Sequence, residues 1–494
     1  MYLSPPSLPQ TPLCLAALIT NTFSYSFPGN GNLVFNAIHS SMRQWGSSLN
    51  HNGMSFFLAT VPEGTELYHG DWRSNPIKGP EWLAFEPEHA LVFTHPFPHN
   101  PPPKDGRPQP PPPLQLQQVA GKLNQAEDGF LHTFAAAKDL RLLYVDGMSA
   151  GKTHNGTMDS QDYILFLNEL GDGGGGMFDE MARARLFCQM VQEKWDGRLD
   201  GMLRMEAGFE IILCDFARDL EALRVTRVRA SEQGKPGDQI GQHAGEMWLP
   251  AVASRYWSIG GDRVILNYEH FLTAYLYELD LFSEGGNLPR LKHVPPDQLE
   301  RMRRDLDALI MNHEPNELSV NWQAVADMVV ERYGNRLRYL ASGQASTLRQ
   351  LQQEIEDALS PFIDYDQRNS SVEVERCSAQ FVRQSTTVTS VAGGAVLSVS
   401  RSVCATLLEA LDYTDYHTVV NQIQGLIDYL SWTAWKDCNG CGDHEICMIP
   451  MWPMGTVDDY NHPQCRDFSR LNGDGPRYWG GNPRRRMSAL PLSF

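Results

Sequence analysis

Short runs of β-prone residues, each closed by turn residues, fill the first half of the chain and constrain its fold more than any other feature. The clearest run is Leu140–Val145, which is followed by Asp146 and Gly147. Branched and aromatic residues favour strands, whereas Gly, Pro and Asp favour the turns between them. Four further runs of this kind are expected to form strands: Met54–Val61, Thr65–Gly70, Glu81–Phe85 and Phe209–Cys214.

The second half of the chain has a different pattern, in which apolar residues recur at helical spacing. Helices are predicted over residues 297–312, 320–341, 346–360 and 402–432. Because strands and helices occupy different halves of the sequence, the predicted fold class is α+β. A mixed β domain is expected first, followed by a mostly α-helical, disulfide-stapled C-terminal domain.

A chain of 494 residues is too long for one ordinary core, so several domains are expected. Residues 1–26 are predicted to be a signal peptide, because an apolar segment precedes small residues, although no Lys or Arg supplies the usual positive charge. The remaining predicted units are an α+β domain at 27–225 with a Pro-rich insertion at 96–114, a connecting segment at 226–296, a helical domain at 297–437 and a Cys/Trp-rich cap at 438–494.

Cysteine usage also favours export from the cell. Removing residues 1–26 takes Cys14 away and leaves eight of the nine cysteines, an even number that suits disulfides. The spacing of Cys438, Cys441, Cys447 and Cys465 is compatible with a zinc site, but disulfides are the default in an oxidising compartment. The sequons at Asn155 and Asn369 fit a secreted glycoprotein.

The charge balance excludes some classes of partner. The chain has 41 Lys and Arg against 59 Asp and Glu, which gives a formal net charge of −18. Nucleic-acid binding needs clustered positive charge, so no nucleic acid is expected as a partner. No uninterrupted apolar run reaches the length of a bilayer, so no membrane span is expected either.

One loop imitates a phosphate-binding motif. Gly147–Thr153 follows a predicted strand and contains the sequence Gly-Lys-Thr. The phosphate-binding loop needs four residues between its two glycines, and only three separate Gly147 from Gly151. The segment is therefore predicted to be a turn between a strand and a loop.

Several short segments of the first half together suggest a family. The strand motif Leu67-Tyr68-His69-Gly70 is followed by Glu81–Ala90, an aromatic strand that leads into a helix, and later by the strand Phe209–Cys214, which carries Glu210. Their order and spacing over roughly residues 55–225 resemble the ADP-ribosyltransferase fold of the diphtheria-toxin and poly-ADP-ribose polymerase type. In that superfamily the corresponding strands surround NAD.

The resemblance implies roles for individual residues. Glu210, or less favourably Glu206, would stabilise the positive charge that develops on the ribose when nicotinamide leaves, and His69 would hydrogen-bond the dinucleotide. Tyr68 and Gly70 belong to the same cofactor-binding strand, and Trp82 or Phe85 would stack on nicotinamide. The implied activity is ADP-ribosyl transfer or NAD hydrolysis, with NAD as substrate, a protein as a candidate acceptor and no metal. The sequence departs from the family where Asp71 follows the His-Gly pair.

Two other classes of function remain open. A secreted glycoside hydrolase acting on a glycan would use a carboxylate pair, with Asp146 and Glu210 as the first candidates and Glu206 and Asp215 nearby in sequence. A non-catalytic protein would use the same concave site to bind a ligand or partner. The segment Glu445–Thr456 is similar to the tails of secreted fungal proteins without an assigned activity, which supports export but no particular chemistry.

Overall fold

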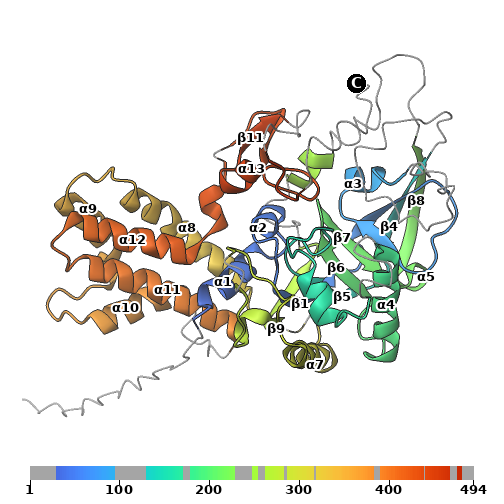
Figure 1. The fold of residues 1–494 in the computed structure, drawn as a ribbon, viewed down its shortest axis with the longest axis horizontal. Helices are drawn as coiled ribbons and strands as arrows, with labels where there is room; N and C mark the ends of the chain where they lie inside the picture. Colours follow the sequence, from blue (N-terminus) through green and yellow to red (C-terminus); the bar gives the residue numbers. More distant parts are fainter. Residues whose placement is uncertain are drawn as a thin grey trace, which may run out of the picture.

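The computed structural model describes residues 29–94, 129–170, 179–228, 248–253, 262–282, 286–315, 317, 319–382, 390–438, 440–467 and 476–480. Within these residues a large mixed sheet lies beside a helical region, and a small Cys-rich unit lies next to both (Figure 1). The α+β class predicted from the sequence is confirmed. The predicted signal peptide at 1–26 and the Pro-rich insertion at 96–114 fall outside the described residues.

Nine strands form the main sheet, in the order β8-β4-β2-β3-β7-β6-β5-β1-β9. Every described neighbouring pair is antiparallel except β5 and β6, which are parallel. The strands are β1 (Ser55–Val61), β2 (Glu66–Asp71), β3 (Glu81–Ala84), β4 (Gly129–Ala136), β5 (Leu140–Val145), β6 (Gly201–Met205), β7 (Phe209–Leu213), β8 (Leu220–Val228) and β9 (Ile265–Thr273).

All five strands predicted from β-prone runs are present in this sheet. The sheet also extends past the predicted domain end at residue 225. Strand β8 continues to Val228, and β9, which lies in the predicted connecting segment, pairs with β1. The central strands β1, β6 and β7 are buried along their whole length, whereas the edge strand β8 is mostly exposed.

The second half of the chain contains six long or medium helices. The first of them, Pro296–Asn312, packs against β9 beside the sheet, so this part of the predicted 297–437 unit lies with the sheet, and the other five form the helical region (Figure 1). The break that divides the predicted helix 402–432 lies before Asp415, whose side chain accepts a hydrogen bond from Thr418 N and so begins a new helix. The helices are α7 (Pro296–Asn312), α8 (Trp322–Ala341), α9 (Leu348–Leu359), α10 (Ser370–Ala379), α11 (Val391–Ala410) and α12 (Tyr416–Leu430).

The first described helix belongs to this helical region rather than to the sheet. Helix α1 (Gly31–Ser40) contacts α8 and α11, and Asn36 Nδ2 donates to Leu430 O at 2.9 Å. After α2 (Gln44–Leu49) the chain enters β1. The N-terminal segment, predicted to be part of the 27–225 domain, therefore joins the two parts of the molecule.

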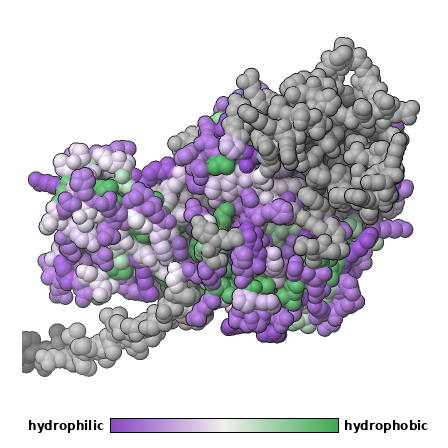
Figure 2. All heavy atoms as spheres, viewed as in Figure 1, coloured by the Kyte–Doolittle hydropathy of each residue, from purple (hydrophilic) through white to green (hydrophobic). Residues whose placement is uncertain are grey.

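Helix α11 is the central helix of the bundle. Of the described helices, α11 is the one that is long enough and apolar enough to span a membrane. However, 61% of its most apolar 18-residue window is buried inside the protein. It packs against α1, α8, α9, α10 and α12. The outer surface of the helical region in Figure 2 is mainly hydrophilic, as expected for helices that bury one face. The apolar composition of α11 is explained by its position in the core of the bundle.

Four disulfides pair the eight cysteines that follow Cys14, which confirms the prediction of disulfide bonds. Two of them close the small C-terminal unit, where β10 (Glu445–Met448) pairs with β11 (Gln464–Asp467) beside α13 (Val457–Asn461). The four cysteines that were also compatible with a zinc site are therefore all paired in disulfides. The pairs are Cys188–Cys214, Cys377–Cys404, Cys438–Cys447 and Cys441–Cys465.

Gly70 on β2 can be tested as a packing position. A Cβ atom there would lie 2.0 Å from Ala90 O of α3 (Pro87–Leu91), so Gly70→Ala is expected to lower the free energy of unfolding by about 2 kcal/mol or more. Urea unfolding measures this change. Gly425→Ala is the matched control, because nothing lies within 4 Å of that Cβ and Ala favours the helix interior, so it should be neutral or stabilising by up to about 1 kcal/mol. Equal effects of the two substitutions would contradict the close approach of α3 to β2.

Candidate functional site

The register of the strands defines which predicted site residues share a face of the sheet. Tyr68 pairs with Ala84, Ala84 pairs with Glu210, and Glu210 pairs with Arg204. Directly paired residues of neighbouring strands point to the same side. Tyr68, Glu210 and Arg204 therefore lie on one face, which is called the Glu210 face below.

His69 lies on the opposite face, because successive residues of a strand alternate. Its Nδ1 donates to Trp82 O at 2.6 Å, and its ring contacts those of His132 and Phe216. The expectation that His69 and Glu210 meet in one cleft is therefore not met by this register. Because a carbonyl oxygen can only accept, this hydrogen bond fixes the proton of His69 on Nδ1 and gives the side chain a structural role.

The other predicted cofactor-binding residues also separate. Trp82 pairs with Ile212 and so shares the Glu210 face, where it is partly exposed. Gly70 faces Ala90 O rather than open space, so its missing side chain serves the packing of α3. Phe85 is buried, with the guanidinium of Arg263 5.7 Å from its ring centroid, and is not placed to stack on a ligand.

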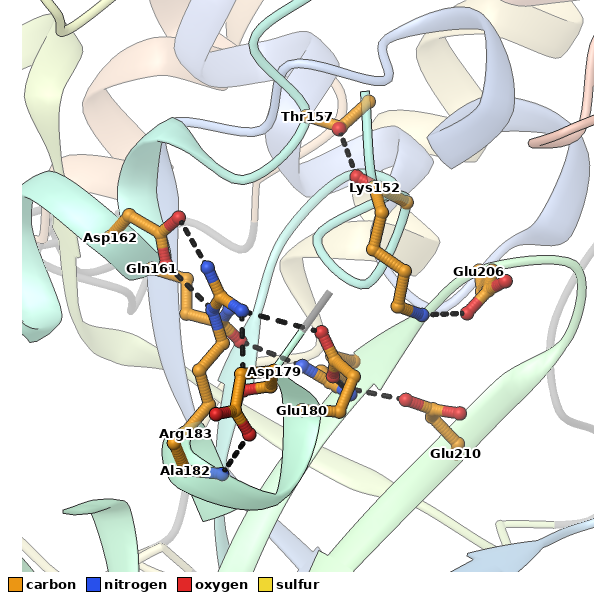
Figure 3. Close-up of polar contacts among 12 residues, drawn as sticks. Lys152, Thr157, Gln161, Asp162, Asp179, Glu180, Ala182, Arg183, Glu206 and Glu210 are labelled. Atoms are coloured by element: carbon orange, nitrogen blue, oxygen red, sulfur yellow. Dashed lines mark hydrogen bonds and ion pairs between the residues drawn. The ribbon is translucent and has the colours of Figure 1, made fainter. Parts of the chain in front are cut away.

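Arg204 is the centre of a buried polar network on the Glu210 face. Its partners Gln161, Glu180 and Glu210 lie close together in Figure 3. Its side chain is 1% exposed. Nε donates to Glu210 Oε1 at 2.8 Å, Nη1 donates to Gln161 Oε1 at 3.0 Å, and Nη2 pairs with Glu180. These contacts join β6 and β7 to the π-helix η1 (Ser160–Leu165) and to α4 (Glu180–Glu193).

Helix α4 begins in this network. The side chain of Asp179 accepts a hydrogen bond from Ala182 N at 2.9 Å and caps the helix. One turn in, Arg183 is paired with both carboxylate oxygens of Asp162, each at 3.0 Å. The Cys188–Cys214 disulfide then ties the helix to the residue that follows β7. The first turn of α4 is thus held over the Glu210 face.

Lys152 brings a second cation to the same place. It lies in the loop after β5 that imitates a phosphate-binding motif, and its Nζ donates to Glu206 Oε2 at 2.5 Å. Its side chain is 3% exposed, and the ring of Trp452 lies 5.2 Å away. Thr157 Oγ1 donates to Gly151 O at 2.5 Å, which fixes the loop from which Lys152 extends.

The balance of charge in this cluster perturbs Glu206. Three carboxylates, Glu180, Glu206 and Glu210, face the cations Lys152 and Arg204, and Arg183, which is paired with Asp162, lies 3.7 Å from Glu180 as well. Burial, reinforced by the neighbouring Glu210 and opposed by Lys152, raises the pKa of Glu206 to about 7. Glu206 therefore exchanges a proton near neutral pH, which is the property of a general acid or base.

Two further residues of the cluster were not selected from the sequence. His89 of α3 lies beside the β6–β7 turn, since a Cβ on Gly208 would be 2.9 Å from His89 Nδ1. Burial lowers the pKa of His89 to about 4, against the attraction of Glu210, and its ring stacks on Trp248. Gln161 is fully buried, and among the described residues its Nε2 has no hydrogen-bond partner. A buried donor of this kind can be satisfied by a water molecule or a ligand.

The carboxylates proposed for glycoside hydrolysis do not meet as expected. Tyr144 pairs with Leu203, the neighbour of Arg204, and therefore lies on the face opposite the Glu210 face. Its Oη donates to Asp146 Oδ1 at 3.2 Å on that opposite face. Asp146 is buried, and burial raises its pKa to about 7. Asp215 caps the short helix α5 (Phe216–Asp219) by accepting from Arg218 N. An Asp146–Glu210 pair is therefore not assembled across the sheet.

The chain is similar in sequence to a protein-family model and to two yeast proteins, none of which is assigned a function. A family model described as the YPL277C N-terminal domain matches residues 28–123 and 98–235. The chain is 32% identical over 255 residues to the uncharacterized protein YPL277C of Saccharomyces cerevisiae (strain ATCC 204508 / S288c), covering 46% of this chain and 47% of the relative. It is 33% identical over 254 residues to the uncharacterized protein YOR389W of the same strain, covering 46% and 36%.

The chain therefore spans less than half the length of each of these relatives. No solved structure is detectably similar to it. The matched family region contains the strands of the Glu210 face and both Glu206 and Glu210.

The pKa of Glu206 predicts a dependence of stability on pH. Because its folded pKa lies above the ordinary value of 4.5, the stability that this group contributes is fully present below pH 4.5 and is lost as the pH rises through about 7. The substitution Glu206→Gln is expected to flatten the decrease in unfolding free energy between pH 5 and pH 8, measured by urea unfolding.

Glu221→Gln is the matched control for this measurement, because Glu221 is an exposed glutamate of β8. It should leave the slope unchanged. Asp146→Asn should flatten the slope in the same direction as Glu206→Gln, since the pKa of Asp146 is raised to about 7 as well. A slope in Glu206→Gln as steep as that of the wild type would show that Glu206 titrates at its ordinary pKa.

Proposed function

We propose that the protein cleaves the bond between nicotinamide and ribose in NAD, as an ADP-ribosyltransferase or an NAD glycohydrolase of the ADP-ribosyltransferase-like fold. The observation that carries the proposal is the cluster of Glu206 and Glu210 on one hairpin, with Glu206 ready to exchange a proton near pH 7. The choice of NAD as substrate follows the resemblance to that superfamily, of whose implied residues Tyr68, Trp82 and Glu210 share one face and His69 does not.

The charge of the cluster suits this chemistry. Departure of nicotinamide leaves positive charge on the ribose, and a carboxylate next to the sugar lowers the energy of that transition state. Glu210 is the carboxylate proposed for this task, held in place by Arg204 at 2.8 Å. With the Arg183–Asp162 pair included, four carboxylates face three cations, so the cluster keeps one excess negative charge when all its members are ionised.

Glu206 is proposed to handle the proton. The C1′–N bond breaks with its electron pair going to nicotinamide, and the oxygen of water or of an acceptor side chain forms the new bond to C1′. That oxygen must lose a proton, and the carboxylate of Glu206 is placed to accept it. Lys152 donates to Glu206 Oε2, and the proposal assigns the other carboxylate oxygen to the nucleophile.

The proposed binding surface differs from the one implied by sequence alone. Trp82 and Tyr68 share the Glu210 face and are partly exposed, so they are the proposed aromatic contacts for nicotinamide or ribose. His69, Gly70 and Phe85 are left out, because each is engaged in packing or bonded elsewhere. His89 takes the place of His69 as the proposed histidine of the site.

Secretion belongs to the same proposal. Four disulfides are compatible with an extracellular protein. Of the two sequons, Asn369 is exposed, whereas Asn155 is partly buried and its Nδ2 donates to Tyr478 O at 3.2 Å. Asn369 is therefore the better candidate for a glycan.

Release of nicotinamide from NAD by the purified full-length chain tests the proposal. We expect turnover in the wild type and a loss of at least about 100-fold in kcat for both Glu206→Gln and Glu210→Gln, since each removes a group that acts in the transition state. Glu221→Gln on β8 should retain the wild-type rate, and His69→Asn should retain far more activity than either cluster variant.

Two results would contradict the proposal. Wild-type protein that is folded by circular dichroism but releases no nicotinamide would exclude this activity. Turnover that depends on His69 and not on Glu206 would move the site to the other face of the sheet. Cleavage of an aryl glycoside that is lost in Glu206→Gln would instead favour the glycoside hydrolase, with Glu206 and Glu210 as its carboxylate pair.

A further inference from the structure

Two histidines and a glutamate from separate parts of the chain converge away from the Glu210 face. The rings of His270 on β9 and His313 after α7 are stacked, with centroids 3.8 Å apart and planes 13° apart. Glu317 Oε2 lies 3.5 Å from His270 Nε2 and 3.8 Å from His313 Nδ1. One ligand atom from each residue lies within 4.8 Å of the others.

The backbone of β9 is distorted to present His270. Phe57 pairs with Phe271 and Ala59 pairs with Leu266, so that residues 267–270 lie opposite Leu58 alone. A bulge of this kind re-aims side chains at the edge of a sheet. Asn267 Oδ1 fixes the bulge by accepting hydrogen bonds from Glu269 N and His270 N, both at 3.0 Å.

The same asparagine fixes the second histidine. Asn267 is fully buried, and its Nδ2 donates to Glu314 O at 3.1 Å, next to His313. Tyr268 N donates to Ser319 Oγ at 3.2 Å, and Arg198 holds the carbonyl of His313. The bulge is therefore bonded to Glu314 and Ser319 by groups other than the three side chains themselves.

We propose that His270, His313 and Glu317 form a binding site for a late first-row divalent metal ion such as Zn²⁺. Two imidazoles and one carboxylate are the donor set of three-ligand zinc sites, which keep a fourth position for water. In a tetrahedral site with bonds of about 2.1 Å, ligand atoms lie about 3.4 Å apart. The two separations from Glu317 are within a few tenths of an ångström of that value. Because an imidazole nitrogen binds a metal in the plane of its ring and the two rings are stacked, one ring has to turn for both nitrogens to reach the same ion.

The surroundings suit an exchangeable metal rather than a closed structural one. The three side chains are each between 33% and 41% exposed, so an ion has access from solvent. Buried Asn267 is not a ligand itself but fixes the backbone that carries the two histidines, as residues around a metal site commonly orient its ligands.

Binding of Zn²⁺ to the chelator-treated, full-length protein tests the site. Isothermal titration with zinc chloride should show one site per chain whose affinity falls at least 10-fold in His270→Gln, His313→Gln and Glu317→Gln. His462→Gln is the matched control, because His462 also lies beside a carboxylate, Asp458 at 3.2 Å, but belongs to no cluster of three metal-ligand residues among those that the structure describes. This control should bind as the wild type does.

Thermal unfolding provides the second measurement. Because the site links β9 to the segment between α7 and α8, Zn²⁺ should raise the Tm of the wild type and of His462→Gln, but not that of His270→Gln or His313→Gln. The ligand variants replace partly exposed side chains, and their Tm without metal checks that they fold. No binding by the wild type, or equal binding by all variants, would overturn the proposal. Neither result bears on NAD cleavage, which is assigned to other residues.

Discussion

A guanidinium group cannot be buried without partners, and the burial of Arg204 organises one whole face of the sheet. Its three contacts are made by Glu210, Gln161 and Glu180, which come from β7, η1 and the first turn of α4. Removing one partner would leave charge buried and unpaired, which commonly costs several kcal/mol. The position of α4, and with it the shape of the Glu210 face, depends on this network.

The same network creates the chemical character of the site. Arg204 is shared by two other carboxylates, and within the described part of the chain the cation paired with Glu206 is Lys152. Burial raises the pKa of Glu206 to about 7. A structural ion cluster thereby contains one group that titrates in the range useful for catalysis. This coupling is why the proposed activity is assigned to the Glu206–Glu210 hairpin rather than to the residues of β2. The zinc site, by contrast, rests on Asn267 and the bulge of β9, which are independent of Arg204.

Local patterns predicted the elements well, because β-branched runs and helical periodicity are properties of short segments. The strands Leu140–Val145 and Phe209–Leu213 and the helix Pro296–Asn312 follow directly from them. The face of the sheet on which each side chain lies is not a local property, because it depends on how the strands pair. Shifting a strand by one residue reverses every side chain, and the register between β2 and β7 is set through β3. Sequence alone therefore could not separate His69 from Glu210. Lys152, His89 and the His270–His313 pair were missed because tertiary folding alone brings them to their partners.

A crystal structure of Glu206→Gln with NAD bound would test the central claim most directly, since the substitution should slow turnover and keep the fold. The proposal predicts that the dinucleotide lies on the Glu210 face, with its ribose C1′ about 4 Å from the Glu210 carboxylate and nicotinamide against Trp82 or Tyr68. NAD bound beside His69 on the opposite face, or an unliganded site at saturating NAD, would contradict it.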